Sequence, residues 1–157
     1  MTTPPTQLET RFLLELAVEL DTPQMHGPTP AGVRKVVPVL GGRFTGDRLS
    51  GTVLPGGGHD WALIRSDGSL RLDVRLTLRT HDGATILLAY QGFRSGPPEV
   101  MARLAAGEAV DPAEYYFRIA ALFETDAPRY AWLNNLVAIG SGERLSYGPR
   151  YRVYEVL

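Results

Sequence analysis

Short segments in which apolar and polar residues alternate run through most of this chain, and turns rich in glycine separate them. In residues 70–80, LRLDVRLTLRT, leucine and valine occupy one face of an extended chain, and arginine, aspartate and threonine occupy the other. Further segments with strand character span residues 12–20, 33–40, 43–54, 60–66, 84–93, 115–125, 130–139 and 150–157. A period of two over short segments predicts a protein built mainly of β-strands.

The turns between these segments favour antiparallel neighbours. Asp67-Gly68 and Asp82-Gly83 each lie between two alternating segments, and glycine tolerates the positive φ that a tight hairpin requires. Gly41-Gly42, Gly56-Gly57-Gly58 and Gly140-Ser141-Gly142 are three further predicted turns. Strands that follow one another in the chain are therefore expected to pair as hairpins.

One segment breaks the period of two. Residues 97–107, PPEVMARLAAG, have prolines at their start and a glycine at their end, which is typical of a short helix. We expect this helix to cover one edge or one mouth of the sheet. Residues 1–8, rich in threonine and proline, are predicted to be a disordered tail, and residues 9–157 a single domain.

Eight or more hairpin-linked strands favour a closed antiparallel β-barrel, because closure removes the exposed strand edges. The interior of a barrel of about eight strands is filled by side chains or holds one small ligand. A sandwich of two sheets is the alternative that the pattern leaves open.

Composition narrows the classes of function. The net charge is −1, which offers no electrostatic footprint for nucleic acid. The chain has no cysteine, so disulfides, thiolate nucleophiles and cysteine-ligated zinc are excluded. No apolar run approaches the roughly 20 residues that span a bilayer, and the N-terminal segment MTTPPTQLETRF lacks the features of a signal peptide. We expect a cytoplasmic protein without a membrane partner.

Two kinds of bound group are also not expected. The glycines at 56–58 lead into the strand-like sequence DWALIRS, without the Lys and Ser or Thr of a phosphate-binding loop, and no dinucleotide fingerprint occurs elsewhere. His26, His59 and His81 are the only histidines, and none has the spacing of a metal site on a helix. The prediction is a protein without a cofactor and without a metal.

A set of motifs in fixed order resembles the DUF3237 family, also called UPF0311. The motifs are GG-x-F-x-G at residues 41–46, LPGG-x-x-DW at 54–61, LD-x-R at 72–75, YFR at 116–118, FET at 123–125 and Y-x-WLN at 130–134. The resemblance covers roughly residues 8–157. It implies a barrel similar to the calycin or allene-oxide-cyclase-like barrels. The family has no assigned biochemical role, so the resemblance implies no reaction.

Polar residues inside two predicted strands are the first candidates for a site. Asp73 and Arg75 share one face of their strand, and Tyr116, Arg118 and Glu124 share one face of another. Burying five polar groups is costly unless they pair with one another or with a ligand. We expect these five to converge on one internal cavity. The alternatives are a solvated outer wall, or an ion pair of Arg118 with Glu124 or Asp73 and no ligand.

Each candidate has an expected role. Asp73 or Glu124 would transfer a proton, while Arg118, Tyr116 or Arg75 would stabilise an oxyanion. The other expected ligand-binding residues, at the wall of the cavity or beside it, are Trp61, Trp132, Asn134 and Asp60. Asp60 has a second interpretation, as a cap on the preceding glycine turn.

Two functions of different classes fit this pattern. The first is a barrel that binds a small, largely apolar, oxygenated organic molecule. The second is a cofactor-independent isomerase, cyclase or lyase, which requires a buried carboxylate with a raised pKa beside an open cavity. Leu122 lies opposite the apolar face of Phe117, Ile119 and Phe123 on the same strand. Because a small barrel buries only one of two such faces, we also expect a homodimer.

Overall fold

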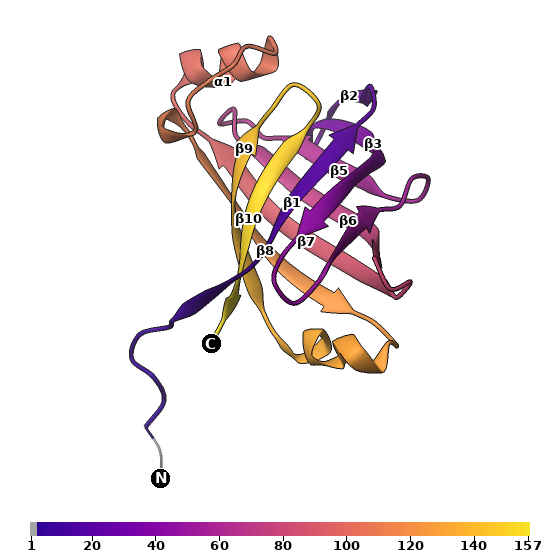
Figure 1. Ribbon diagram of the computed structural model, residues 1–157. Helices are drawn as coiled ribbons and strands as arrows, with labels where there is room; N and C mark the ends of the chain where they lie inside the picture. Colours follow the sequence, from indigo (N-terminus) through magenta and orange to yellow (C-terminus); the bar gives the residue numbers. More distant parts are fainter. Residues whose placement is uncertain (1–2) are drawn as a thin grey trace.

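A computed structural model describes residues 3–157, and in it antiparallel strands close into a barrel (Figure 1). The predicted fold class, mainly β with a closed antiparallel barrel, is confirmed. In chain order the strands are β1 (Thr10–Leu20), β2 (Gln24–Thr29), β3 (Gly32–Thr45), β4 (Ser50–Val53), β5 (His59–Ile64), β6 (Leu70–Thr80), β7 (Thr85–Ser95), β8 (Tyr116–Glu124), β9 (Ala138–Arg144) and β10 (Pro149–Val156).

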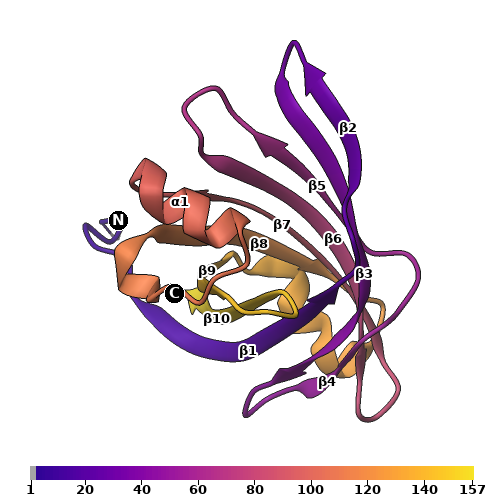
Figure 2. The same ribbon diagram turned by 90° about the horizontal axis from the view of Figure 1, so that it is seen from above.

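The order of strands around the barrel follows the chain from β6 to β10. β10 pairs with β1, β1 pairs with β3, and β4 and β5 connect β3 back to β6, which closes the ring. The result is an eight-stranded barrel with two extra strands. β2 pairs only with β3 and stands away from the ring, as the view from above shows (Figure 2).

Closure depends on a close approach between β1 and β3. Gly41 and Gly42 do not form the predicted turn but lie within β3, which runs without a break from Gly32 to Thr45. A Cβ atom on Gly42 would lie 2.1 Å from the carbonyl oxygen of Ala17 in β1, and the φ of Gly42 is +144°. Only glycine combines this conformation with this contact, so Gly42 allows β3 to pair closely with β1.

The apolar faces of the strands form the core. In β6 every second residue from Leu70 to Leu78 is buried, and in β8 the same holds from Phe117 to Phe123. The alternation in the sequence therefore predicts correctly which residues share a face. The turns at Gly68 and Gly83 are also confirmed, since both glycines have positive φ of 84° and 90°.

Helical segments lie at the two ends of the barrel (Figure 1). α1 (Pro98–Ala105) lies inside the segment predicted to be helical, and it buries Val100 and Leu104. η1 (Pro112–Glu114) is a single 3₁₀ turn that precedes β8. At the opposite end lies η2 (Pro128–Asn135), also a 3₁₀ helix, which buries Tyr130 and Leu133.

The predicted strand at residues 130–139 is wrong for most of its length, because η2 occupies residues up to Asn135 and β9 begins at Ala138. The predicted turn at residues 140–142 is also wrong, since these residues lie within β9. Their glycines have a packing role. A Cβ atom on Gly142 would lie 2.8 Å from the ring of Phe117 and 2.9 Å from that of Tyr151.

The N-terminal segment leaves the barrel before β1 begins. Residues 3–9 are exposed and lead away from the strands (Figure 1). Disorder of residues 1–8 stays a prediction, and residues 1 and 2 lie outside the described part of the chain. None of the helices formed by residues 3–157 has the length and apolar character needed to cross a bilayer.

Candidate functional site

The polar rows of β6 and β8 lie on the outer wall of the barrel. Arg75, Tyr116, Arg118 and Glu124 are exposed and Asp73 is half-buried. The prediction that these five side chains converge on an internal cavity is wrong. The rows that alternate with them consist of leucine, valine, isoleucine, alanine and phenylalanine, and burying those removes far more apolar area from water. Only one face of each strand points inward, and the apolar face occupies it.

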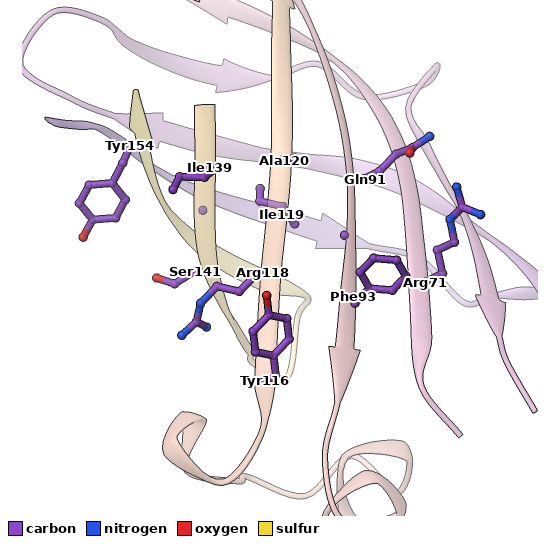
Figure 3. A pocket seen from close by; sticks show the side chains of 12 residues that line it. Arg71, Gln91, Phe93, Tyr116, Arg118, Ile119, Ala120, Ile139, Ser141 and Tyr154 are labelled. Carbon is purple, nitrogen blue, oxygen red and sulfur yellow. The ribbon is translucent and has the colours of Figure 1, made fainter. Parts of the chain in front are cut away.

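Two of the five candidates line a groove on the outer wall (Figure 3). The groove has a volume of about 640 Å³ and lies over β7, β8 and β9, where Phe93, Tyr116 and Arg118 project from the sheet. The guanidinium of Arg118 lies 5.2 Å from the Tyr116 ring centroid and donates a hydrogen bond to the carbonyl of Phe117. Within residues 3–157 Arg118 forms no ion pair with Asp73 or Glu124.

Three predicted wall residues do not line a common cavity either. Trp61 projects outward from β5 and is 51% exposed. Trp132 lies in η2, with the guanidinium of Arg48 4.3 Å from its ring centroid. The side-chain amide of Asn134 accepts a hydrogen bond from the backbone of Thr125 and donates one back, at 2.8 and 3.0 Å. Asn134 therefore fastens η2 to the segment after β8.

A second cavity lies inside the barrel, at the mouth between the β1–β2 connection and the β9–β10 turn. Its volume is about 290 Å³. Its lining combines apolar, polar and charged side chains: Leu20, Asp21, Thr22, Pro23, Lys35, Val37, Asp60, Leu70, Leu72, Arg94, Phe117, Arg144, Ser146, Tyr147 and Pro149. Asp60 is the single residue among the nine sequence-predicted site residues that lines this cavity. The lining is therefore about as polar as it is apolar, and a concave pocket in which polar groups converge among apolar side chains can orient a small polar molecule.

Asp60 is a carboxyl group buried inside this apolar barrel. It lies in β5, where it pairs with Val37 of β3 and Val74 of β6, and it is only 7% exposed. Within the described residues its sole hydrogen bond comes from the backbone N–H of Asp73 to Oδ1, at 3.1 Å. Burial raises the pKa of Asp60 to about 6, although the Asp73 N–H and the charge of Lys35 oppose the shift.

Three cationic side chains reach the same cavity from three strands. Lys35 comes from β3, Arg94 from β7 and Arg144 from the end of β9. Burial lowers the pKa of each of them. The Nε atom of Arg94 is buried without a hydrogen-bond partner, and one guanidinium nitrogen of Arg144 donates only to the carbonyl of Leu145, at 2.8 Å. In the described chain none of the three pairs with a carboxylate.

Two buried tyrosines lie next to this charged group. Tyr90 and Tyr151 pack edge to face with ring centroids 5.3 Å apart, and Tyr151 packs in the same way on Phe117. Burial raises the pKa of both phenols, so both stay neutral near pH 7. The hydroxyl of Tyr151 has no partner among the described residues.

Metal binding has no cluster to support it in residues 3–157, where no three His, Asp or Glu side chains come together.

Lys35, Arg94 and Arg144 were not among the residues predicted from the sequence. The signal for Arg94 was present, because the inward alternation of Leu88 and Tyr90 continues through Gly92 to Arg94. Lys35 likewise lies two residues before the buried Val37 and therefore on the same face of β3.

Comparisons with known proteins agree with this architecture. A UPF0311 protein of Rhodopseudomonas palustris (strain TIE-1) is 36% identical over 150 residues, which cover 96% of this chain and 97% of that one. The crystal structure of a conserved protein of unknown function from Rhodopseudomonas palustris superposes with a TM-score of 0.93 at 35% identity, covering 98% of this chain and all of that chain. A more distant relative is a protein of Penicillium herquei named hydroalkoxylation enzyme, 26% identical over 142 residues, which cover 90% of this chain and 79% of that one.

The family model described as a protein of unknown function, DUF3237, matches residues 8–156. This range contains the barrel, the inner cavity and every motif that resembled the family in the sequence. The chain therefore belongs to the DUF3237 family, whose bacterial relatives carry the name UPF0311.

Proposed function

We propose that the inner cavity binds a small oxygenated organic molecule and that Asp60 transfers a proton to or from it, without a cofactor. The observation that carries this proposal is the buried carboxyl group of Asp60 beside an open cavity. A carboxyl group with a pKa of about 6 is present in both its acid and its base form near neutral pH. Such a group is suited to general acid–base catalysis.

The named activity of the Penicillium herquei relative suggests one reaction of this kind. Hydroalkoxylation adds a hydroxyl O–H across a carbon–carbon double bond. The carboxylic acid form of Asp60 would donate its proton to one carbon, the hydroxyl oxygen would bond to the other carbon, and the hydroxyl proton would pass to the resulting carboxylate. Substrate and product are then isomers, so the step requires no oxidant or reductant.

A direct test uses a molecule that carries both a hydroxyl and a conjugated double bond. 2′-Hydroxychalcone cyclises by this addition, and the loss of its enone absorbance reports the rate. We expect the protein to accelerate the reaction and Asp60→Asn to reduce the rate by about 100-fold or more. Glu124→Gln on the outer wall is the matched control and should keep the full rate. A rate equal to that in buffer, or full activity of Asp60→Asn, would contradict catalysis by Asp60 on this substrate class.

The second candidate function is binding without a reaction. The apolar lining from Leu20, Val37, Leu70 and Leu72 supports it, because these side chains hold an apolar ligand without altering it. A binding protein would retain 2′-hydroxychalcone equally well in the wild type and in the Asp60→Asn variant, and neither form would cyclise it. The cytoplasmic location expected from the sequence stays a prediction.

A further inference from the structure

We infer that the inner cavity selects molecules with an anionic oxygen, such as a carboxylate, phenolate or enolate, and that Arg94, Arg144 and Lys35 bind that oxygen. The inference deepens the proposed function, since it takes the same cavity as the ligand site. It is carried by the charge balance of the lining and by the buried Nε donor of Arg94, which has no partner among the described residues.

The charge balance of the cavity is positive. Three cations line it, whereas its carboxylates are Asp60 and Asp21. Asp21 lies exposed at the rim, and its Oδ1 already accepts the backbone N–H of Thr22 at 2.7 Å. With Asp60 ionised the lining has a net charge of about +1, and with Asp60 protonated about +2.

Buried cations without counterions are costly and are normally paired or hydrogen-bonded. Elsewhere in the barrel the buried carboxylate of Glu155 follows this rule by pairing with Arg11 and Arg48. Arg94 departs from it, because its Nε atom has no partner among the described residues; its guanidinium lies 5.8 Å from the centroid of the Phe117 ring. An oxygen anion between Arg94 and Arg144 would satisfy both guanidinium groups.

Burial raises the pKa of Asp60, and the charges of Lys35 and Arg94 oppose this rise without cancelling it. The titratable groups that act on it come from several strands: Lys35 of β3, Asp73 of β6, Tyr90 and Arg94 of β7 and Tyr151 of β10. An anionic ligand on the arginines would neutralise part of their charge and raise the pKa of Asp60 further. Asp60 would then hold its proton until the substrate accepts it.

Binding of 2-naphthoate, compared with neutral 2-naphthalenemethanol of nearly the same shape, tests the inference by calorimetry. We expect the anion to bind about tenfold or more tightly than the alcohol, and Arg94→Gln and Arg144→Gln each to weaken naphthoate about tenfold. Arg79→Gln on the exposed face of β6 is the control and should bind like the wild type. Circular dichroism verifies folding, and Lys35→Gln, which changes the third cation, provides another measurement if an arginine variant fails to fold.

The outcomes separate this inference from the proposed function. Equal affinity for the acid and the alcohol, or unchanged naphthoate binding in the arginine variants, would overturn the anion site whatever Asp60 does. Anion selectivity together with full turnover by Asp60→Asn would uphold the anion site and overturn the catalytic role of Asp60. Asp60→Asn itself should bind naphthoate at least as tightly as the wild type, because it removes a negative charge from the cavity.

A different observation carries a second proposal: the geometry points to a second copy of this chain as the occupant of the outer groove. The wall over β7, β8 and β9 exposes large apolar side chains that do not pack on the barrel, with Leu122 at 58%, Val137 at 52% and Ile139 at 43%. Soluble monomers rarely leave several such side chains together on one face.

The face is complementary to itself. Ala120 lies in the middle of the outer row of β8 and pairs with Gln91 of β7, so small side chains and backbone form the floor of the groove beside the projecting Leu122. If two copies pack about a two-fold axis at Ala120, Leu122 of one copy packs on the aliphatic stem of Arg118 of the other, beside this floor. The same symmetry brings Glu124 of one copy to Tyr116 and Arg118 of the other, which pairs opposite charges.

Light scattering at tens of micromolar protein tests the pairing. We expect a mass twice the 17.2 kDa of one chain, and Leu122→Glu should give a single chain because it buries a charge at the centre of the contact. Arg43→Glu, on the exposed face of β3, is the control and should remain a dimer. A monomeric wild type would overturn the proposal, and a dimeric Leu122→Glu would place the interface elsewhere and overturn it equally.

Discussion

At the scale of single residues, Asp60 is an acidic side chain whose surroundings disfavour its charged form. Its carboxylate lies in an apolar barrel with one hydrogen bond, and burial holds its pKa at about 6. In the unfolded chain the pKa is near 4. The folded state therefore binds the Asp60 proton more tightly than the unfolded state does between pH 4 and pH 6.

This difference predicts the direction of a stability change with pH. Since the folded pKa is the higher one, Asp60 destabilises the fold progressively as pH rises from about 4 to about 6, by about 3 kcal/mol in total. Asp60→Asn removes the effect, so the variant should gain stability relative to the wild type across this window. Urea unfolding at pH 4 and pH 7 measures it. Parallel pH profiles for the two proteins would show that Asp60 is not a strained carboxyl group.

The alternation in the sequence predicts correctly which side chains share a face of a strand, but not which face points into the barrel. The pattern showed which side chains share a face, but it did not show that the polar row of Asp73 and Arg75 faces solvent. Apolar area decides that question, and the leucines of β6 outweigh the gain from pairing two charges. Arg94 was not predicted as a site residue, because it is a single charged residue at the end of the apolar row of β7, whereas the candidates were chosen from rows of several polar residues.

At the scale of elements, the antiparallel pairing of β1 with β3 depends on Gly42. Gly42→Ala would place a methyl group 2.1 Å from the Ala17 carbonyl oxygen, and we expect it to lower the free energy of unfolding by at least about 2 kcal/mol. Gly56→Ala is the control, since Gly56 also has positive φ but no atom within 4 Å. It should lose only about 1 kcal/mol. Equal losses in chemical denaturation would show that the contact with Ala17 does not limit closure.

The position of η2 depends on a polar cluster around Asp82. Tyr130 and Arg129 of η2 each donate a hydrogen bond to this carboxylate at 2.8 Å, and Thr80 donates another. The hydrogen bonds from Thr80 and Tyr130 lower the pKa of Asp82 to about 2. This cluster explains why residues 130–135 form a helical cap instead of the predicted strand, which no pattern within that segment reveals.

Because the folded pKa of Asp82 is depressed, its stabilising effect is present above about pH 4 and is lost as pH falls toward 2. Asp82→Asn should therefore lower the Tm at pH 7, and the gap from the wild type should narrow on acidification. Tyr130→Phe should lower the Tm as well, but the double variant should lose less than the sum, since both residues belong to one cluster. Additive losses would indicate that Tyr130 and Asp82 act independently.

At the scale of the whole molecule, the barrel separates two surfaces of different chemistry. The interior holds the buried carboxyl and the three cations, and the outer wall over β7 to β9 presents the apolar groove. Closure was predictable because hairpin turns and alternation are local signals. The inner cavity was not, because Lys35, Asp60, Arg94 and Arg144 are separated by 25 residues or more in the chain and meet only when β3 and β1 close the ring.

The pKa of Asp60, measured by carboxyl carbon NMR, tests the central claim most directly. We expect its resonance to titrate with a midpoint near pH 6 in the free protein, and at a higher pH when 2-naphthoate is bound, because the added negative charge favours the protonated form. A midpoint near 4, the ordinary value for an aspartate, would contradict the account, since Asp60 would then be a fully ionised carboxylate without the proton that the proposed chemistry requires.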